Sequence, residues 1–106
     1  MVEKSIDNKI MDSIKKYIDR ISEHYKIEAI ILFGSYAKGT NTEDSDIDVA
    51  IVSSEFEDIY DVMAELMGLT WNLDTRIEPH PIKAKDFEEK TNPFIHEIIE
   101  TGIKVA

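Results

Sequence analysis

Apolar residues recur at steps of three and four along the first part of the chain, which is the period of a helix with one buried face. The members of this stripe are Ile6, Ile10, Ile14, Tyr17, Ile18, Ile21 and Tyr25. Charged residues fill most positions between them, so the opposite face is expected in solvent. The pattern predicts a core-facing helix over residues 5–25, capped at its start by Ser5 or Asp7.

Two apolar runs of strand length follow this helix. Residues 27–33 are mostly apolar and partly β-branched, which is typical of a strand inside a sheet with both faces covered. Residues 46–52 begin with an alternation of acids and apolar side chains, in which Asp46 and Asp48 stand two positions apart. Since successive side chains of a strand point to opposite faces, both carboxylates are expected on one face and Ile47 on the other.

The second half of the chain begins with another long helical pattern. Residues 54–57 form a capping-box pattern, and the helical spacing after them continues to about Asn72. Met63, Met67 and Trp71 are large apolar residues at helical spacing, which we interpret as core or partner contacts rather than as a cofactor site.

A third strand and a last helix complete the pattern. Residues 75–79 alternate as a strand does, and the run Pro79-His80-Pro81 is expected to end that strand. Residues 83–90 predict a short helical turn. Asn92, which precedes a proline, predicts the cap of a last helix that ends at Gly102, before a short closing segment.

This order of elements is typical of an α/β (α+β) fold. We expect a small mixed β-sheet with helices packed on one face and the carboxylates at an open edge of the other. A chain of 106 residues, 42% of them hydrophobic, suffices for one modest core, so residues 1–106 are expected to form a single domain.

The net charge of −10 indicates what kind of partner the protein prefers. Phosphate backbones are held by lysine and arginine, so direct nucleic acid binding is not expected, and a basic protein partner fits better. The absence of cysteine excludes disulfides and thiolate metal sites. No apolar run is long enough to cross a bilayer and the first residues lack a signal-peptide pattern, so we expect a cytoplasmic protein without membrane contact.

Candidate chemistry lies between the two apolar runs. Gly34 follows residues 27–33 directly, and a glycine there lets the backbone bend sharply and approach a ligand. Ser35 then offers a hydroxyl and an amide, and Lys38 lies in a short helical turn that Gly39 is expected to end. Glycine-serine pairs are common in ordinary turns, but such a turn also suits phosphate oxygens.

Asp46 and Asp48 follow the glycine-serine turn after ten residues. Two like charges so close repel each other, and a divalent cation relieves the repulsion. Hard oxygen ligands beside a phosphate-bearing substrate favour Mg²⁺ or Mn²⁺ over zinc. The histidines His24, His80 and His96 are not spaced as a metal set, and only His80, beside the third strand, is a candidate for substrate contact.

Gly34-Ser35, ten intervening residues and Asp46-Ile47-Asp48 together resemble the signature of the polymerase-beta-like nucleotidyltransferase superfamily, and the short chain resembles its minimal nucleotidyltransferase branch. The resemblance is close over residues 27–52 and looser over residues 70–106. It implies that a third acid on the third strand faces the aspartate pair. Glu78 suits that role by spacing and strand alternation, and Asp74 is the competing residue.

The resemblance also implies a reaction, the transfer of a nucleotidyl group, AMP from ATP, to a hydroxyl. The implied catalytic and metal-binding residues are Asp46, Asp48 and Glu78, and the implied nucleotide-binding residues are Gly34, Ser35 and Lys38. Glu78 would either bind the metal ion or take the proton from the attacking hydroxyl, and Lys38 and Arg76 would stabilise charge.

The acceptor of the nucleotidyl group has several candidates. The resemblance points to antitoxins paired with a helical HEPN-type ribonuclease toxin, in which case a tyrosine of the toxin would receive AMP and the acidic charge would complement a basic surface. A homodimer mate would be another source of the acceptor site. The alternatives are a small-molecule, aminoglycoside-type nucleotidyltransferase subunit and a non-catalytic acidic binding module that covers a partner.

Overall fold

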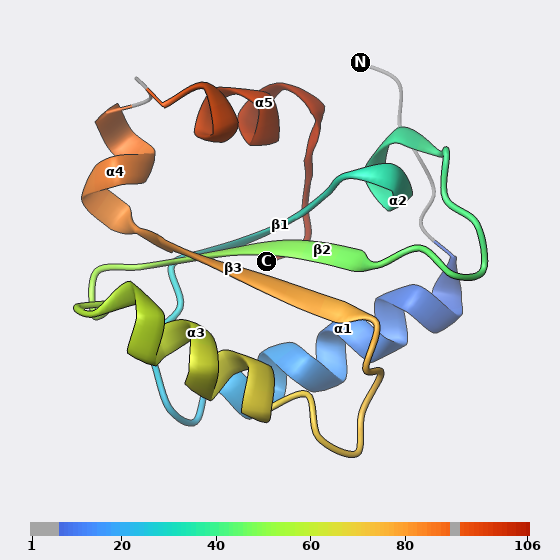
Figure 1. Ribbon diagram of the computed structural model, residues 1–106, viewed down its shortest axis with the longest axis horizontal. Helices are drawn as coiled ribbons and strands as arrows, with labels where there is room; N and C mark the ends of the chain where they lie inside the picture. Colours follow the sequence, from blue (N-terminus) through green and yellow to red (C-terminus); the bar gives the residue numbers. More distant parts are fainter. Residues whose placement is uncertain (1–6, 90–91) are drawn as a thin grey trace.

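Four strands of the described residues form one mixed sheet. The computed structural model describes residues 7–89 and 92–106 (Figure 1). The strands are β1 (Ala29–Phe33), β2 (Ile47–Ser53), β3 (Ile77–Lys83) and β4 (Ile103–Lys104). They lie in the order β3-β2-β1-β4, where β1 pairs antiparallel with both β2 and β4, and β2 pairs parallel with β3. The predicted small mixed sheet is therefore confirmed.

Helices lie on both sides of this sheet. They are α1 (Asn8–Ile21), α2 (Ser35–Lys38), α3 (Ile59–Gly68), α4 (Ala84–Glu89) and α5 (Pro93–Thr101). In Figure 1, α1 and α3 lie on one side of the strands and α5 lies on the other. None of these helices is long and apolar enough to cross a membrane.

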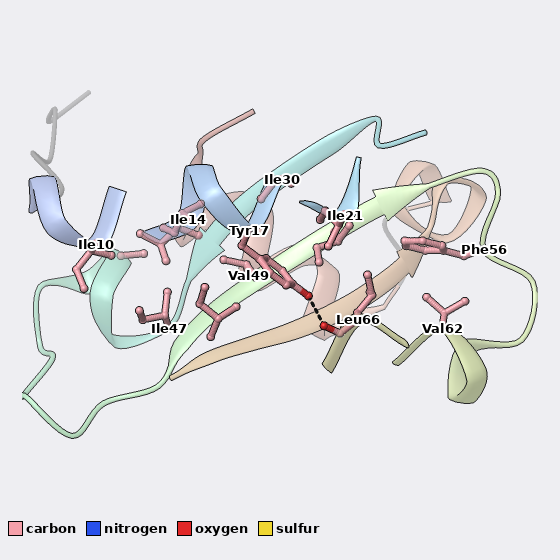
Figure 2. Close-up of a cluster of buried hydrophobic side chains, with 14 residues drawn as sticks. Ile10, Ile14, Tyr17, Ile21, Ile30, Ile47, Val49, Phe56, Val62 and Leu66 are labelled. Carbon is pink, nitrogen blue, oxygen red and sulfur yellow. Dashed lines mark hydrogen bonds between the residues drawn. The ribbon is translucent and has the colours of Figure 1, made fainter. Parts of the chain in front are cut away.

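The larger core lies between the sheet and the pair α1 and α3 (Figure 2). Its α1 members are the inner part of the apolar stripe, and its strand members alternate along β1, β2 and β3. They include Ile10, Ile14, Tyr17 and Ile21 of α1, Ile30 and Leu32 of β1, Ile47, Val49 and Ile51 of β2, and Ile77 of β3. Tyr17 donates a hydrogen bond of 2.7 Å from its buried hydroxyl to the carbonyl oxygen of Leu66 on α3, so the two helices are joined beneath the sheet.

A second, smaller core lies on the opposite face of the sheet. Ile95 and Ile98 of α5 pack there with Ile31, Ala50 and Val52. The sequence pattern did not indicate that α5 would cover this face, which we expected to stay open beside the carboxylates. While α5 covers part of the face, Asp48 lies at the end of the sheet where β1 finishes and β2 begins.

The first helix is shorter than its apolar stripe suggested. It ends at Ile21 rather than at residue 25, because Ser22 and its neighbours form turns whose amides bond back to carbonyls of the last helical residues. The predicted cap at Asp7 is confirmed, since its carboxylate accepts a hydrogen bond from the Lys9 amide at 2.7 Å. Ser5, the other predicted cap, lies outside the described residues.

The predicted boundaries of α3 were wrong at both ends. Its cap is Asp58, whose side chain accepts hydrogen bonds from the amides of Tyr60 and Asp61, and not the pattern at residues 54–57. The helix ends at Gly68 instead of near Asn72, which has a positive φ of 61°. Trp71 therefore lies outside the helix with 76% of its surface exposed, so it is not a core residue, and its role as a partner contact stays a prediction.

We expected the third strand to end at its prolines, and this expectation was wrong. It runs to Lys83 through Pro79 and Pro81 at the edge of the sheet. The Ile47 amide donates to the carbonyl of Arg76, so even-numbered residues direct their backbone groups toward β2 and odd-numbered residues direct theirs outward. At both prolines, the backbone nitrogen that lacks a hydrogen therefore faces the free edge of the sheet. No hydrogen bond between strands is lost there.

The last part of the chain follows the predicted pattern. Residues 84–89 form the short helix α4. The Asn92 side chain accepts a hydrogen bond from the amide of Phe94 at 2.9 Å and caps α5, which ends before Gly102. The closing segment then pairs with β1 as β4, through Ile31 with Lys104 and Leu32 with Ile103.

The hydrogen bond between Tyr17 and Leu66 gives a test of how the two helices are joined. We expect Tyr17→Phe to lower the free energy of unfolding by about 1 kcal/mol, because it leaves the buried Leu66 carbonyl without that donor. Tyr60→Phe is the matched control, since Tyr60 is 88% exposed, and should leave stability unchanged. Urea unfolding measures both variants, and equal effects would contradict the proposed role of this bond.

Candidate functional site

Strand register brings one residue from each of three strands into a single row. Phe33 at the end of β1 lies opposite Asp48 on β2, and Asp48 lies opposite Glu78 on β3. Gly34 follows Phe33 directly in the chain. The glycine-serine turn and two of the predicted acids therefore meet at one end of the sheet.

Gly34 lies close to the carboxylate of Asp48. Its backbone has φ 74° and ψ −150°, a region that only glycine adopts readily. A Cβ atom placed on Gly34 would lie 2.5 Å from Asp48 Oδ2, closer than van der Waals contact permits. The glycine is thus required both by the turn and by the close approach of the acid.

The turn leads into the one-turn helix α2, as expected. Gly39 ends it in the left-handed conformation, and the buried Ala37 anchors it in the larger core. Lys38 forms an ion pair of 3.1 Å with Glu97 of α5, and both side chains are about half exposed. Since exposed ion pairs contribute little energy, this contact leaves Lys38 free to exchange partners.

Asp48, Glu78 and the histidine His80 form a compact group of potential metal ligands. One ligand atom from each lies within 4.8 Å of the others. His80 Nε2 is 3.2 Å from Asp48 Oδ1 and 3.8 Å from Glu78 Oε1. All three side chains are partly exposed, so the group is open to solutes.

Asp46 lies just before β2, is exposed, and is not a member of this group. It nevertheless acts on Glu78. The pKa of Glu78 is raised by partial burial, by a hydrogen bond with Asp46 and by the charges of Asp48 and Asp46, with His80 opposing. Three carboxylates therefore converge closely enough to disfavour the ionised form of Glu78.

The structure distinguishes between the two candidates for the third acid. The Asp74 carboxylate is paired with the Arg76 guanidinium, from which it accepts hydrogen bonds of 2.7 and 3.0 Å. It also accepts a hydrogen bond of 3.3 Å from the Ser13 hydroxyl. The guanidinium of Arg76 lowers the pKa of Asp74. Glu78, and not Asp74, lies opposite Asp48. Arg76, directly before β3, also donates to the hydroxyl of Tyr36 at 3.1 Å, so it links the start of β3 to α2.

Sequence reasoning did not place His80 among the metal ligands or detect its aromatic neighbours. The ring of Phe33 lies edge-on to the His80 ring, with 4.9 Å between the ring centroids. The ring centroid of Phe94 on α5 lies 5.6 Å from that of Phe33. Strand alternation did contain a signal, because Glu78 and His80 are two residues apart and must share a face of β3. We did not use this signal, because we expected the strand to end at Pro79, before His80.

Comparison with known proteins identifies the family to which the chain belongs. The family model described as "Polymerase beta, Nucleotidyltransferase" matches residues 14–106, so the chain belongs to that family. A relative from Methanocaldococcus jannaschii, named "Putative protein adenylyltransferase MJ1379", is 32% identical over 91 residues, which cover 77% of this chain and 91% of the relative. Family and relative together support nucleotidyltransferase activity.

Two solved structures share the fold. One is described as a "putative nucleotidyltransferase from Sulfolobus solfataricus" and has a TM-score of 0.66 at 15% identity. The match covers 97% of this chain and 87% of the chain in that structure. A structure described as a toxin-antitoxin with AMP-PNP has a TM-score of 0.58 at 21% identity and covers 91% of this chain and 72% of its own. The polymerase-beta-like fold expected from the sequence is therefore confirmed.

Substitution of Gly34 tests the contact with Asp48. We expect Gly34→Ala to destabilise the protein by more than Gly39→Ala, for which backbone strain alone predicts about 1 to 2 kcal/mol. Gly39 has a similar φ of 76°, but an added Cβ there meets nothing within 4 Å. Unfolding in urea measures both, and combining Gly34→Ala with Asp48→Ala should recover part of the loss. No recovery would mean that the clash is unimportant.

The raised pKa of Glu78 predicts a pH-dependent gain of stability in Glu78→Gln. Ionising Glu78 costs free energy in the folded state, a penalty that is absent below the ordinary carboxyl pKa and grows as pH rises through the raised pKa. Without divalent cations, Glu78→Gln should be more stable than the wild type at about pH 7.5 and equal to it at about pH 4. Glu57→Gln, which removes an exposed acid, controls for net charge in the same thermal unfolding series. An equal gain in both variants would contradict the prediction.

Proposed function

We propose that this nucleotidyltransferase moves AMP from ATP to a hydroxyl of a protein partner in a metal-dependent reaction, and that it serves as an antitoxin. The observation that carries the proposal is the convergence of Asp48 and Glu78 beside the Gly34 turn, with Asp46 close to Glu78. An adenylyl transfer also agrees with the name of the relative from Methanocaldococcus jannaschii.

The donor set fits a divalent cation. Carboxylate oxygens are hard ligands. Burial and the neighbouring acids raise the pKa of Glu78, and the repulsion between the acids is relieved when a cation binds between them. Asp46, Asp48 and Glu78 would hold Mg²⁺ or Mn²⁺. When bound, the ion would neutralise charge on the α-phosphoryl oxygens and on the pyrophosphate.

The turn would hold the remainder of the nucleotide. Gly34 and Ser35 stand at the start of α2, where backbone amides and the serine hydroxyl can bond to the β- and γ-phosphates. Lys38, whose exposed pairing with Glu97 is easily exchanged, would add positive charge. Arg76 would act indirectly, because its bonds to Asp74 and Tyr36 position α2.

The alternative role of Glu78, in place of binding the ion, is to receive the acceptor's proton. In the transfer, the acceptor oxygen forms a bond to the α-phosphorus, the bond from that phosphorus to the bridging oxygen breaks, and pyrophosphate leaves. The proton of the hydroxyl passes to Glu78 in the arrangement in which this carboxylate does not bind the ion, because its raised pKa then makes it a stronger base than an ordinary carboxylate.

The acceptor would be a tyrosine of a HEPN-type toxin. The similarity in fold to a toxin-antitoxin structure supports a protein partner. The net charge of −10 supports a basic one, because complementary charge speeds and orients association. A second copy of the chain is the other protein that could supply the acceptor site.

Transfer of label from ATP tests the proposal. With α-labelled ATP, Mg²⁺ or Mn²⁺ and the co-purifying partner, we expect label on a partner tyrosine, located by mass spectrometry. Asp48→Asn should reduce the rate by roughly a hundredfold or more, because it removes a metal-binding carboxylate. Asp44→Asn, an exposed acid in the loop before β2, is the matched control and should retain the wild-type rate.

Two outcomes would contradict the proposal. Formation of a complex without labelled partner would favour the non-catalytic binding module. Equal loss of rate in Asp44→Asn and Asp48→Asn would show that general acidity, and not the site, is responsible.

A further inference from the structure

The third strand brings an imidazole into the group of acids. Glu78 and His80 share one face of β3, and the register sets them opposite Asp48 and Ala50 of β2. Ala50 has no side chain beyond Cβ, so the His80 ring can reach along the sheet to Asp48. Its Nε2 atom lies within 4 Å of carboxylate oxygens from both strands.

We propose that His80 Nε2 is a direct ligand of the divalent cation, and that it makes the site prefer Mn²⁺ to Mg²⁺. The inference rests on the proposed function only in using the same acids. Mg²⁺ keeps oxygen ligands and water, whereas an imidazole nitrogen raises the affinity for first-row transition-metal ions. Adding one nitrogen to a set of carboxylates therefore changes the balance between the two ions.

The distances suit a shared ion. The three ligand atoms lie within 4.8 Å of one another, and two atoms on opposite sides of an ion with bonds of about 2.2 Å are about 4.4 Å apart. The group needs to close by only a few tenths of an ångström at most. Asp46, whose carboxylate is close enough to Glu78 to raise its pKa, would approach the ion from outside this group.

The His80 ring is already held in place. Phe33 contacts it edge-on with ring centroids 4.9 Å apart. The ring centroid of Phe94 lies 6.0 Å from that of His80. Only 24% of its side chain is exposed. A ligand whose rotamer is restricted before binding loses little entropy when the ion arrives, so the aromatic neighbours favour coordination.

The competing role for His80 is a positioning one. With its proton on Nε2, the ring would only donate a hydrogen bond to Asp48 Oδ1 and orient that carboxylate. A positioning residue would affect every divalent ion alike, whereas a nitrogen ligand affects Mn²⁺ selectively and couples magnetically to it. These two consequences separate the roles.

Metal titration without nucleotide or partner tests the proposal. Isothermal titration calorimetry of the full chain would give the dissociation constants for Mn²⁺ and Mg²⁺, and pulsed electron paramagnetic resonance would detect nitrogen bound to Mn²⁺. We expect nitrogen coupling in the wild type. His80→Gln should weaken Mn²⁺ binding about tenfold or more, with less than about a threefold change for Mg²⁺. His96→Gln, an exposed histidine of α5 paired with Glu100, is the control and should change neither.

Two results would overturn the assignment of His80 as a ligand. One is wild-type protein with bound Mn²⁺ and no nitrogen coupling, which is decisive even if His80→Gln fails to fold. The other is an equal loss of affinity for both ions in a folded His80→Gln variant. Protein that shows nitrogen-coupled Mn²⁺ but transfers no AMP would overturn the proposed function and leave the ligand assignment standing.

Discussion

The parallel pairing of β2 with β3 is the constraint on which the site depends. It sets Asp48 opposite Glu78, an arrangement of like charges that is unfavourable by itself. The opposite face of the same strands carries Ile47, Val49 and Ile77, all buried against α1 and α3. A shift of one residue would turn these side chains to the other face, so the core holds the register and the register holds the acids together.

The site concentrates features that oppose stability, and the rest of the fold offsets them. Gly34 adopts a backbone conformation that only glycine adopts readily and has no room for a side chain beside the Asp48 carboxylate, and Glu78 lies among other acids. Around them, Arg76 connects β3 to α2, and Ala37 anchors α2 in the core. Strain and charge repulsion at a site supported by rigid elements are typical of binding centres that a ligand completes.

The family and the structure contribute different parts of the functional picture. Membership of the polymerase beta nucleotidyltransferase family defines the class of reaction. The particular arrangement of this chain adds His80, enclosed by Phe33 and Phe94, to the acids. Nucleotidyl transfer would use the carboxylates, while the imidazole would determine which ion they hold. The two proposals therefore concern one site but depend on separate chemistry.

The sequence by itself determined the features that depend on neighbours in the chain. The buried stripe of α1, the caps at Asp7 and Asn92, and the turn at Gly34 follow from interactions over a few residues. Spacing favoured Glu78 over Asp74, but only the tertiary structure decided that Glu78 meets Asp48, that β3 continues past Pro79, and that His80 joins the acids. These outcomes depend on pairing between strands about thirty residues apart and on which strand lies at the edge, and no local pattern of side chains specifies either.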